Sequence, residues 1–157
     1  MKSEKRIRKI TQDFAKRMDV KELPISLEKL EEIATKNNWK ILSFKSKLGE
    51  KIIKTLNLEI YTKTTKGFAY VSDDYKIIFF KDDLEYLEKI SVICHEMGHF
   101  VLRHINTNIC CKNKHISKRI RIKQEIEADI FALELQAPTY LMKSMYLDTA
   151  KKLYDEG

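Results

Sequence analysis

Hydrophobic residues recur at three- and four-residue steps in several parts of this chain, which is the spacing of helices with one buried face. Each such segment predicts a helix, at 4–18, after Ser26, at 83–104 and at 122–135. Either Asp82 or Asp83 would cap the third of these helices. Pro138 is expected to start or kink a final helix.

Shorter apolar runs, some of them alternating with polar residues, predict strands. These strands are expected at 39–44, 56–62, 67–72 and 76–80. A tight turn at Asp73-Asp74 would join the last two of them. Together with the helices, this pattern predicts an α+β fold: one domain spanning residues 1–157, with a small, mainly antiparallel sheet and helices packed on it.

The predicted helix 83–104 carries His95 and His99 on one face, with Glu96 beside the first of them. Residues four apart lie one turn along the same face, so both imidazoles can reach one metal ion. This H-E-x-x-H pattern is typical of zinc peptidases, in which the ion activates water and polarises a carbonyl. Glu96 would take the proton of that water and hand it to the leaving amine.

Gly98 lies inside the same pattern, where glycine costs about 1 kcal/mol relative to alanine. One reason for its presence would be another stretch of backbone that passes close to the metal face of the helix, and the alternative is a glycine that is merely tolerated. His104 is about 140° round the helix from His99. We therefore expect His104 to be no ligand, and to lie at the helix C-terminus where the helix dipole favours it.

A catalytic zinc ion normally has three protein ligands, so a third one is expected downstream. Glu125 is the preferred candidate, and Asp129, four residues later, would then hydrogen-bond the far nitrogen of a ligand histidine. Glu127 is the rival ligand, turned about 200° away from Glu125 on the helix. The buried stripe of this helix is predicted to comprise Ile122, Ile126, Ile130 and Leu133, widened by Phe131 and Leu135.

Composition narrows the classes of function. The chain has 157 residues, of which 43% are hydrophobic, and it lacks both a membrane-spanning run and the apolar core of a signal peptide. Its three cysteines are a poor disulfide framework, with Cys94 expected to be a buried hydrophobe. A cytoplasmic location is therefore expected. Cys110, Cys111 and His115 could form a second soft-metal site, but a plain thiol-bearing loop at 105–118 is the preferred interpretation.

The formal net charge is +7, and basic residues concentrate at 2–9 and 112–123. Such clusters can contact phosphate, yet no helix-turn-helix, zinc-finger or RNA-binding signature accompanies them. Direct nucleic-acid binding is therefore not favoured. The second cluster could instead help to dock a protein substrate electrostatically.

Two blocks, 94–104 and 125–138, resemble the ImmA/IrrE-type metallopeptidases. The resemblance implies a zinc endopeptidase, often encoded beside a helix-turn-helix repressor that it cleaves. It also implies that His95, His99 and Glu125 bind Zn²⁺ and that Glu96 is catalytic. The ending Leu135-Gln136-Ala137-Pro138 departs from the usual leucine-methionine-proline of that family.

One further expectation follows from this zincin-like interpretation. An edge strand of the sheet could hold an extended peptide by strand addition, and 67–72 is the candidate strand. The competing hypothesis is a non-catalytic, metal-binding regulatory module that sequesters a partner protein. The sequence leaves open the substrate, the scissile bond and the residue that stabilises the transition state.

Overall fold

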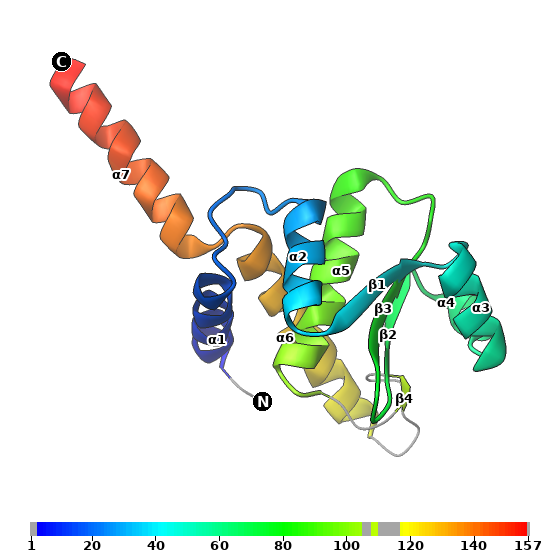
Figure 1. Ribbon diagram of the computed structural model, residues 1–157. Coiled ribbons are helices and arrows are strands. Elements are labelled where there is room, and N and C mark those ends of the chain that lie inside the picture. The colour runs from blue at the N-terminus through cyan, green and yellow to red at the C-terminus, as the bar shows by residue number, and fades with distance from the viewer. Residues whose placement is uncertain (1–2, 105–107, 110–116, 157) are drawn as a thin grey trace.

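The computed structural model describes residues 3–104, 108–109 and 117–156 (Figure 1). Within these ranges helices pack on one small sheet in which two of the three strand pairings are antiparallel, which confirms the predicted α+β class. The elements are α1 (Glu4–Arg17), α2 (Leu27–Lys36), β1 (Trp39–Ser43), α3 (Lys47–Thr55), α4 (Glu59–Thr64), β2 (Gly67–Val71), β3 (Lys76–Phe80), α5 (Tyr86–Val101), β4 (Asn108–Ile109), α6 (Lys118–Gln136) and α7 (Thr139–Glu156).

The strands form one mixed sheet in the order β1-β3-β2-β4. The β1–β3 pairing is parallel, whereas β2 pairs antiparallel with both β3 and β4. The predicted turn between β2 and β3 is confirmed, since the Ser72 amide donates to the Tyr75 carbonyl at 2.8 Å. In the described part of the chain β4 pairs with Tyr70 and Val71, so only the Gly67 end of β2 retains the character of an edge strand.

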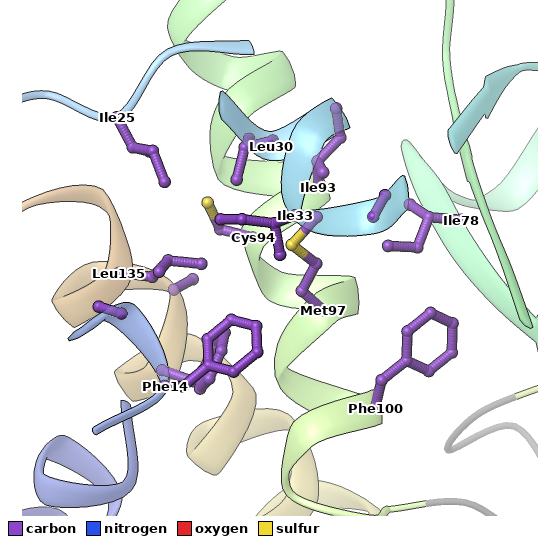
Figure 2. Close-up of a cluster of buried hydrophobic side chains, with 14 of the residues drawn as sticks. Phe14, Ile25, Leu30, Ile33, Ile78, Ile93, Cys94, Met97, Phe100 and Leu135 are labelled. Carbon is purple, nitrogen blue, oxygen red and sulfur yellow. The ribbon is translucent and has the colours of Figure 1, made fainter. Parts of the chain in front are cut away.

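The main hydrophobic core lies between the sheet and the helices α1, α2, α5 and α6. Figure 2 shows Ile33, Ile78, Met97 and Leu135 converging there from four different elements. Cys94 is fully buried in the same core, as expected, and burial raises the pKa of its thiol. A second cluster, which includes Phe68 and Phe79, lies under α3 and α4.

The strand predicted at 56–62 is wrong, because this segment holds the C-cap of α3 and most of α4. Ser46 caps α3 by accepting a hydrogen bond from the Gly49 amide at 3.1 Å. Asn57 then adopts a left-handed conformation with φ of 57°, which separates the two helices. The apolar residues of the segment alternate only by chance, since Leu58 is buried while Ile60 is 62% exposed.

Helix α5 begins at Tyr86, three residues later than predicted, with Glu85 at the N-cap. Neither Asp82 nor Asp83 caps the helix. The Asp82 carboxylate instead accepts a hydrogen bond from the Lys45 amide at 2.9 Å, which ties the segment before the helix to the end of β1. Leu87, in the first turn of the helix, is exposed.

The predicted buried stripe of α6 is largely wrong. Ile122, Ile126 and Leu133 are exposed, whereas Phe131 and Leu135 are buried as expected. The buried face is rotated because it includes two glutamates with partners, Glu127 and Glu134. The Glu134 side chain accepts hydrogen bonds from α1 and from the start of α7, namely from Arg8, Gln12 and Thr139.

Helix α7 starts directly after Pro138, as predicted, and extends away from the body of the molecule (Figure 1). It contains no buried residue. Within the described ranges, no helix combines the length and the apolar character needed to span a membrane. Most of the predicted loop 105–118, including Cys110, Cys111 and His115, lies outside the described residues.

Candidate metal centre

The site depends on the close packing of α5 against α6, the pair of helices with the most extensive contact. Gly98 makes this approach possible, because a Cβ there would lie 3.1–3.2 Å from three side-chain atoms of Phe131. Gly98 thus has a packing reason, but the expected neighbour was wrong: a buried side chain, not a backbone, lies against the helix here. The two helices consequently present their polar residues toward each other next to the core.

Three predicted ligands converge at this junction. The Nε2 atoms of His95 and His99 are 3.2 Å apart, and the Glu125 carboxylate lies 2.8 Å from the first and 3.4 Å from the second. Two nitrogen ligands bound to a tetrahedral zinc ion at about 2.0–2.1 Å would be about 3.3 Å apart. The two histidine nitrogens therefore have the type and spacing of zinc ligands, and the Glu125 carboxylate, at hydrogen-bond distance from His95, supplies a third donor of suitable type.

The outer nitrogen of His95 is also engaged. Its Nδ1 atom lies 2.7 Å from Oδ1 of Asp129, one turn after Glu125 on α6. The structure thus brings Asp129 to the position predicted for it, beside the far nitrogen of a candidate ligand. Such a partner fixes the tautomer and the orientation of a metal-binding histidine.

His104 and Glu127 occupy positions that the sequence did not indicate. His104 is 4% exposed; its Nδ1 atom lies 3.0 Å from Nδ1 of His99, and its Nε2 atom lies 2.7 Å from Oε1 of Glu127. Glu127 therefore faces His104 in the structure, whereas Glu125 faces the histidine pair. We expected His104 to lie on the last turn of the helix, where the helix dipole would favour it. That expectation is wrong, because α5 ends at Val101 and His104 lies beyond its C-cap.

The end of α5 explains how His104 returns to His99. Arg103 adopts a left-handed conformation with φ of 56°, its amide donates to the Phe100 carbonyl, and the His104 amide donates to the His99 carbonyl. These are the two hydrogen bonds of a Schellman motif, which brings the second residue past the cap next to the third-last residue of the helix. No sequence signal marked this end, because arginine stands where glycine is usual.

Negative charge dominates the surroundings of His95. Burial opposes its charged form, but the hydrogen bond to Glu125 and the charges of Glu96, Glu125 and Asp129 outweigh burial and raise the pKa of His95 to about 9. For Glu125, burial would raise the pKa. The hydrogen bonds and charges of His95 and His99 outweigh this effect and hold the pKa of the Glu125 carboxyl well below its usual range. Such surroundings favour a cation.

A pocket of about 320 Å³ opens over these groups. Glu96, only 8% exposed, lines this pocket together with the two histidines and Glu125. Gly67 at the start of β2 forms part of the wall, where a Cβ would overlap Val92 of α5 and lie 2.8 Å from the Phe79 carbonyl oxygen. A cation site with an adjacent carboxylate, open to a pocket beside a strand, has the layout of a metal-dependent hydrolase.

Comparison with known proteins supplies the family. The model of the IrrE N-terminal-like domain, a peptidase family (M78), matches residues 48–155, which is more than half of the chain. The chain therefore belongs to this family, as the two motif blocks predicted, and the match supports a metallopeptidase-like role. No curated protein and no solved structure matched the chain significantly.

Proposed function

We propose that this protein is a zinc-dependent endopeptidase. The observation that carries the proposal is the convergence of two imidazole Nε2 atoms and one carboxylate from α5 and α6, beside Glu96 and open to one pocket. Two histidines and one glutamate form a common ligand set of catalytic zinc sites, in which the fourth position is left for water. Membership of a peptidase family supports the same conclusion.

In this proposal His95, His99 and Glu125 hold the metal. A zinc ion bound by such donors lowers the pKa of water to about 7 and polarises a carbonyl group. Glu96 accepts the proton of the attacking water on a carboxylate oxygen, and then delivers it to the nitrogen of the leaving amine. Its low exposure limits competing contacts with bulk water, and Asp129 keeps the His95 ring in place.

We further propose that the substrate is a regulatory protein, with a helix-turn-helix repressor as the leading candidate. The support is the resemblance of the two motif blocks to proteases of that kind, together with family membership. An extended segment of the substrate would bind along β2 beside Gly67, where the strand meets the pocket. The basic residues near α6 would favour an acidic partner surface.

Metal content and cleavage, measured on the same preparations, test this function. We expect stoichiometric zinc by elemental mass spectrometry in the wild type and in Glu96→Gln, and loss of zinc in Glu125→Ala. With a proteome-derived peptide library and with the repressor encoded nearest to the gene, cleavage should require Glu96. Equal cleavage by wild type and Glu96→Gln would refute the mechanism, whereas bound zinc without cleavage of either probe would favour the non-catalytic regulatory module.

A further inference from the structure

A line of three buried side chains leads away from the candidate metal position. His99, His104 and Glu127 are 1%, 4% and 6% exposed, and the contacts that join them measure 3.0 Å and 2.7 Å. Two of these residues come from α5 and its cap, and the third comes from α6. Buried polar groups so arranged constrain one another strongly, because water cannot replace their partners.

Hydrogen placement along this line follows from the chemistry of the groups. An ionised carboxylate only accepts hydrogen bonds, so His104 donates to Glu127 from Nε2. A neutral His104 then has a lone pair on Nδ1, and His99 must donate to it from its own Nδ1. The consequence is that the Nε2 atom of His99 presents a lone pair toward His95 and Glu125.

We propose that Glu127 and His104 are positioning residues that hold His99 in the tautomer a metal ligand requires. The inference rests on the proposed metal centre and adds its buried support. Reversing the hydrogens would put an N–H of His99 toward the metal position, where it would block binding. The carboxylate of Glu127, acting through His104, also makes His99 a more basic ligand.

The chain supplies a matched control for testing this role. Glu134 lies on the same helix, is 2% exposed, and also accepts several hydrogen bonds, but its partners are Arg8, Gln12 and Thr139 rather than metal-site residues. Glu127→Gln and Glu134→Gln thus each remove one buried negative charge from α6 with little change of shape. Only the first alters the line to His99.

The experiment measures the zinc dissociation constant of wild type, Glu127→Gln and Glu134→Gln by competition with a chromogenic chelator. Outer partners of metal-binding histidines typically contribute about 10- to 100-fold in affinity. We expect Glu127→Gln to weaken zinc binding by about that factor, and Glu134→Gln to leave it within about twofold of wild type. Equal zinc affinity in wild type and Glu127→Gln would overturn the positioning role and leave the proposed function standing.

A measurement on the unmutated protein keeps the inference testable if Glu127→Gln does not fold. Long-range ¹H–¹⁵N spectra of the zinc-loaded wild type report which ring nitrogen of each histidine carries hydrogen. We expect hydrogen on Nδ1 of His99 and on Nε2 of His104. The opposite tautomer at His104 would overturn the inference, and a wild type that binds no zinc would overturn this inference and the proposed function together.

Discussion

The two histidines that face the candidate metal position are one helical turn apart and have very different surroundings. The outer nitrogen of His95 meets Asp129, whose side chain is 68% exposed. That of His99 meets a buried histidine, which in turn meets a buried glutamate. Water and salt screen the first arrangement but not the second. The His95–Asp129 and His104–Glu127 hydrogen bonds are both 2.7 Å long. They are nevertheless expected to differ in their effect on metal binding and on the free energy of unfolding.

The largest contrast is expected from removing each histidine. Both His95→Ala and His99→Ala should lose stoichiometric zinc, because only two ligands remain. In the metal-free protein, His99→Ala also leaves a cavity and deprives His104 of a partner, which we expect to cost about 2–4 kcal/mol. His95→Ala should cost less, about 1–2 kcal/mol, because the partners of His95, Glu125 and Asp129, are 45% and 68% exposed and solvent screens them.

Elemental analysis and urea unfolding in the presence of a chelator check both parts of this prediction. Wild type under the same conditions is the reference. Equal losses of unfolding free energy in the two variants would show that the buried surroundings of His99 add nothing to stability.

A smaller effect is expected at Asp129. We expect Asp129→Asn to weaken zinc binding by less than about 10-fold, because this outer partner is exposed and the asparagine oxygen can still accept from His95. The difference from wild type should shrink further as salt is raised. Chelator competition at low and high ionic strength measures this difference in zinc affinity. A salt-independent loss as large as that of Glu127→Gln would show that Asp129 and Glu127 contribute equally to zinc binding.

Gly98→Ala is expected to change the distance between α5 and α6, the helices that supply the histidines and the carboxylates of the site. The new methyl group would press on Phe131, which is fully buried and packs against Phe14, so the ring has little room to move. Overpacking costs about 1–3 kcal/mol, and the gain in helix propensity returns about 1 kcal/mol. We expect a net loss near 1 kcal/mol in urea unfolding. A stabilised variant would show that α6 can shift without disturbing the core.

The smallest effect is expected at the cap that turns His104 toward His99. Arg103 has a left-handed conformation, which costs non-glycine residues about 1–2 kcal/mol, and glycine is the usual residue at this position. Arg103→Gly should therefore raise the free energy of unfolding by up to about 1 kcal/mol and leave zinc affinity unchanged. Thermal unfolding with a parallel zinc titration measures both, and a decrease in stability would indicate that the Arg103 side chain has a structural role.

The sequence predicted those parts of the site that depend on spacing within one helix. His95, Glu96 and His99 needed only the helical repeat, and Asp129 followed from Glu125 by the same rule. The structure places His95 in contact with His99, Glu125 and Asp129. Glu96 lines the same pocket. Most of the elements that form the sheet and the core were also predictable from their hydrophobic periodicity.

What the sequence did not predict depends on tertiary contacts. The isoleucines of α6 form a regular apolar stripe, yet the helix buries Glu127 and Glu134 instead, because their partners lie on other elements. The contact between His104 and His99 requires a helix end at an arginine in a conformation that arginine rarely adopts. Helices α3 and α4 were missed because the N-cap at Ser46 and the left-handed conformation of Asn57 are local features too weak to outweigh an apolar run.

A residue such as Gly67, whose role is steric, would be difficult to distinguish from a catalytic residue in a genetic screen. Any side chain at this position would overlap Val92 on the active helix and crowd the Phe79 carbonyl oxygen. In a saturation library scored only by lost activity, substitutions of Gly67 would cluster with those of the metal ligands although glycine has no reactive group. Scoring the same library by zinc retention would place Gly67 in a different class, that of residues which keep the strand beside the pocket.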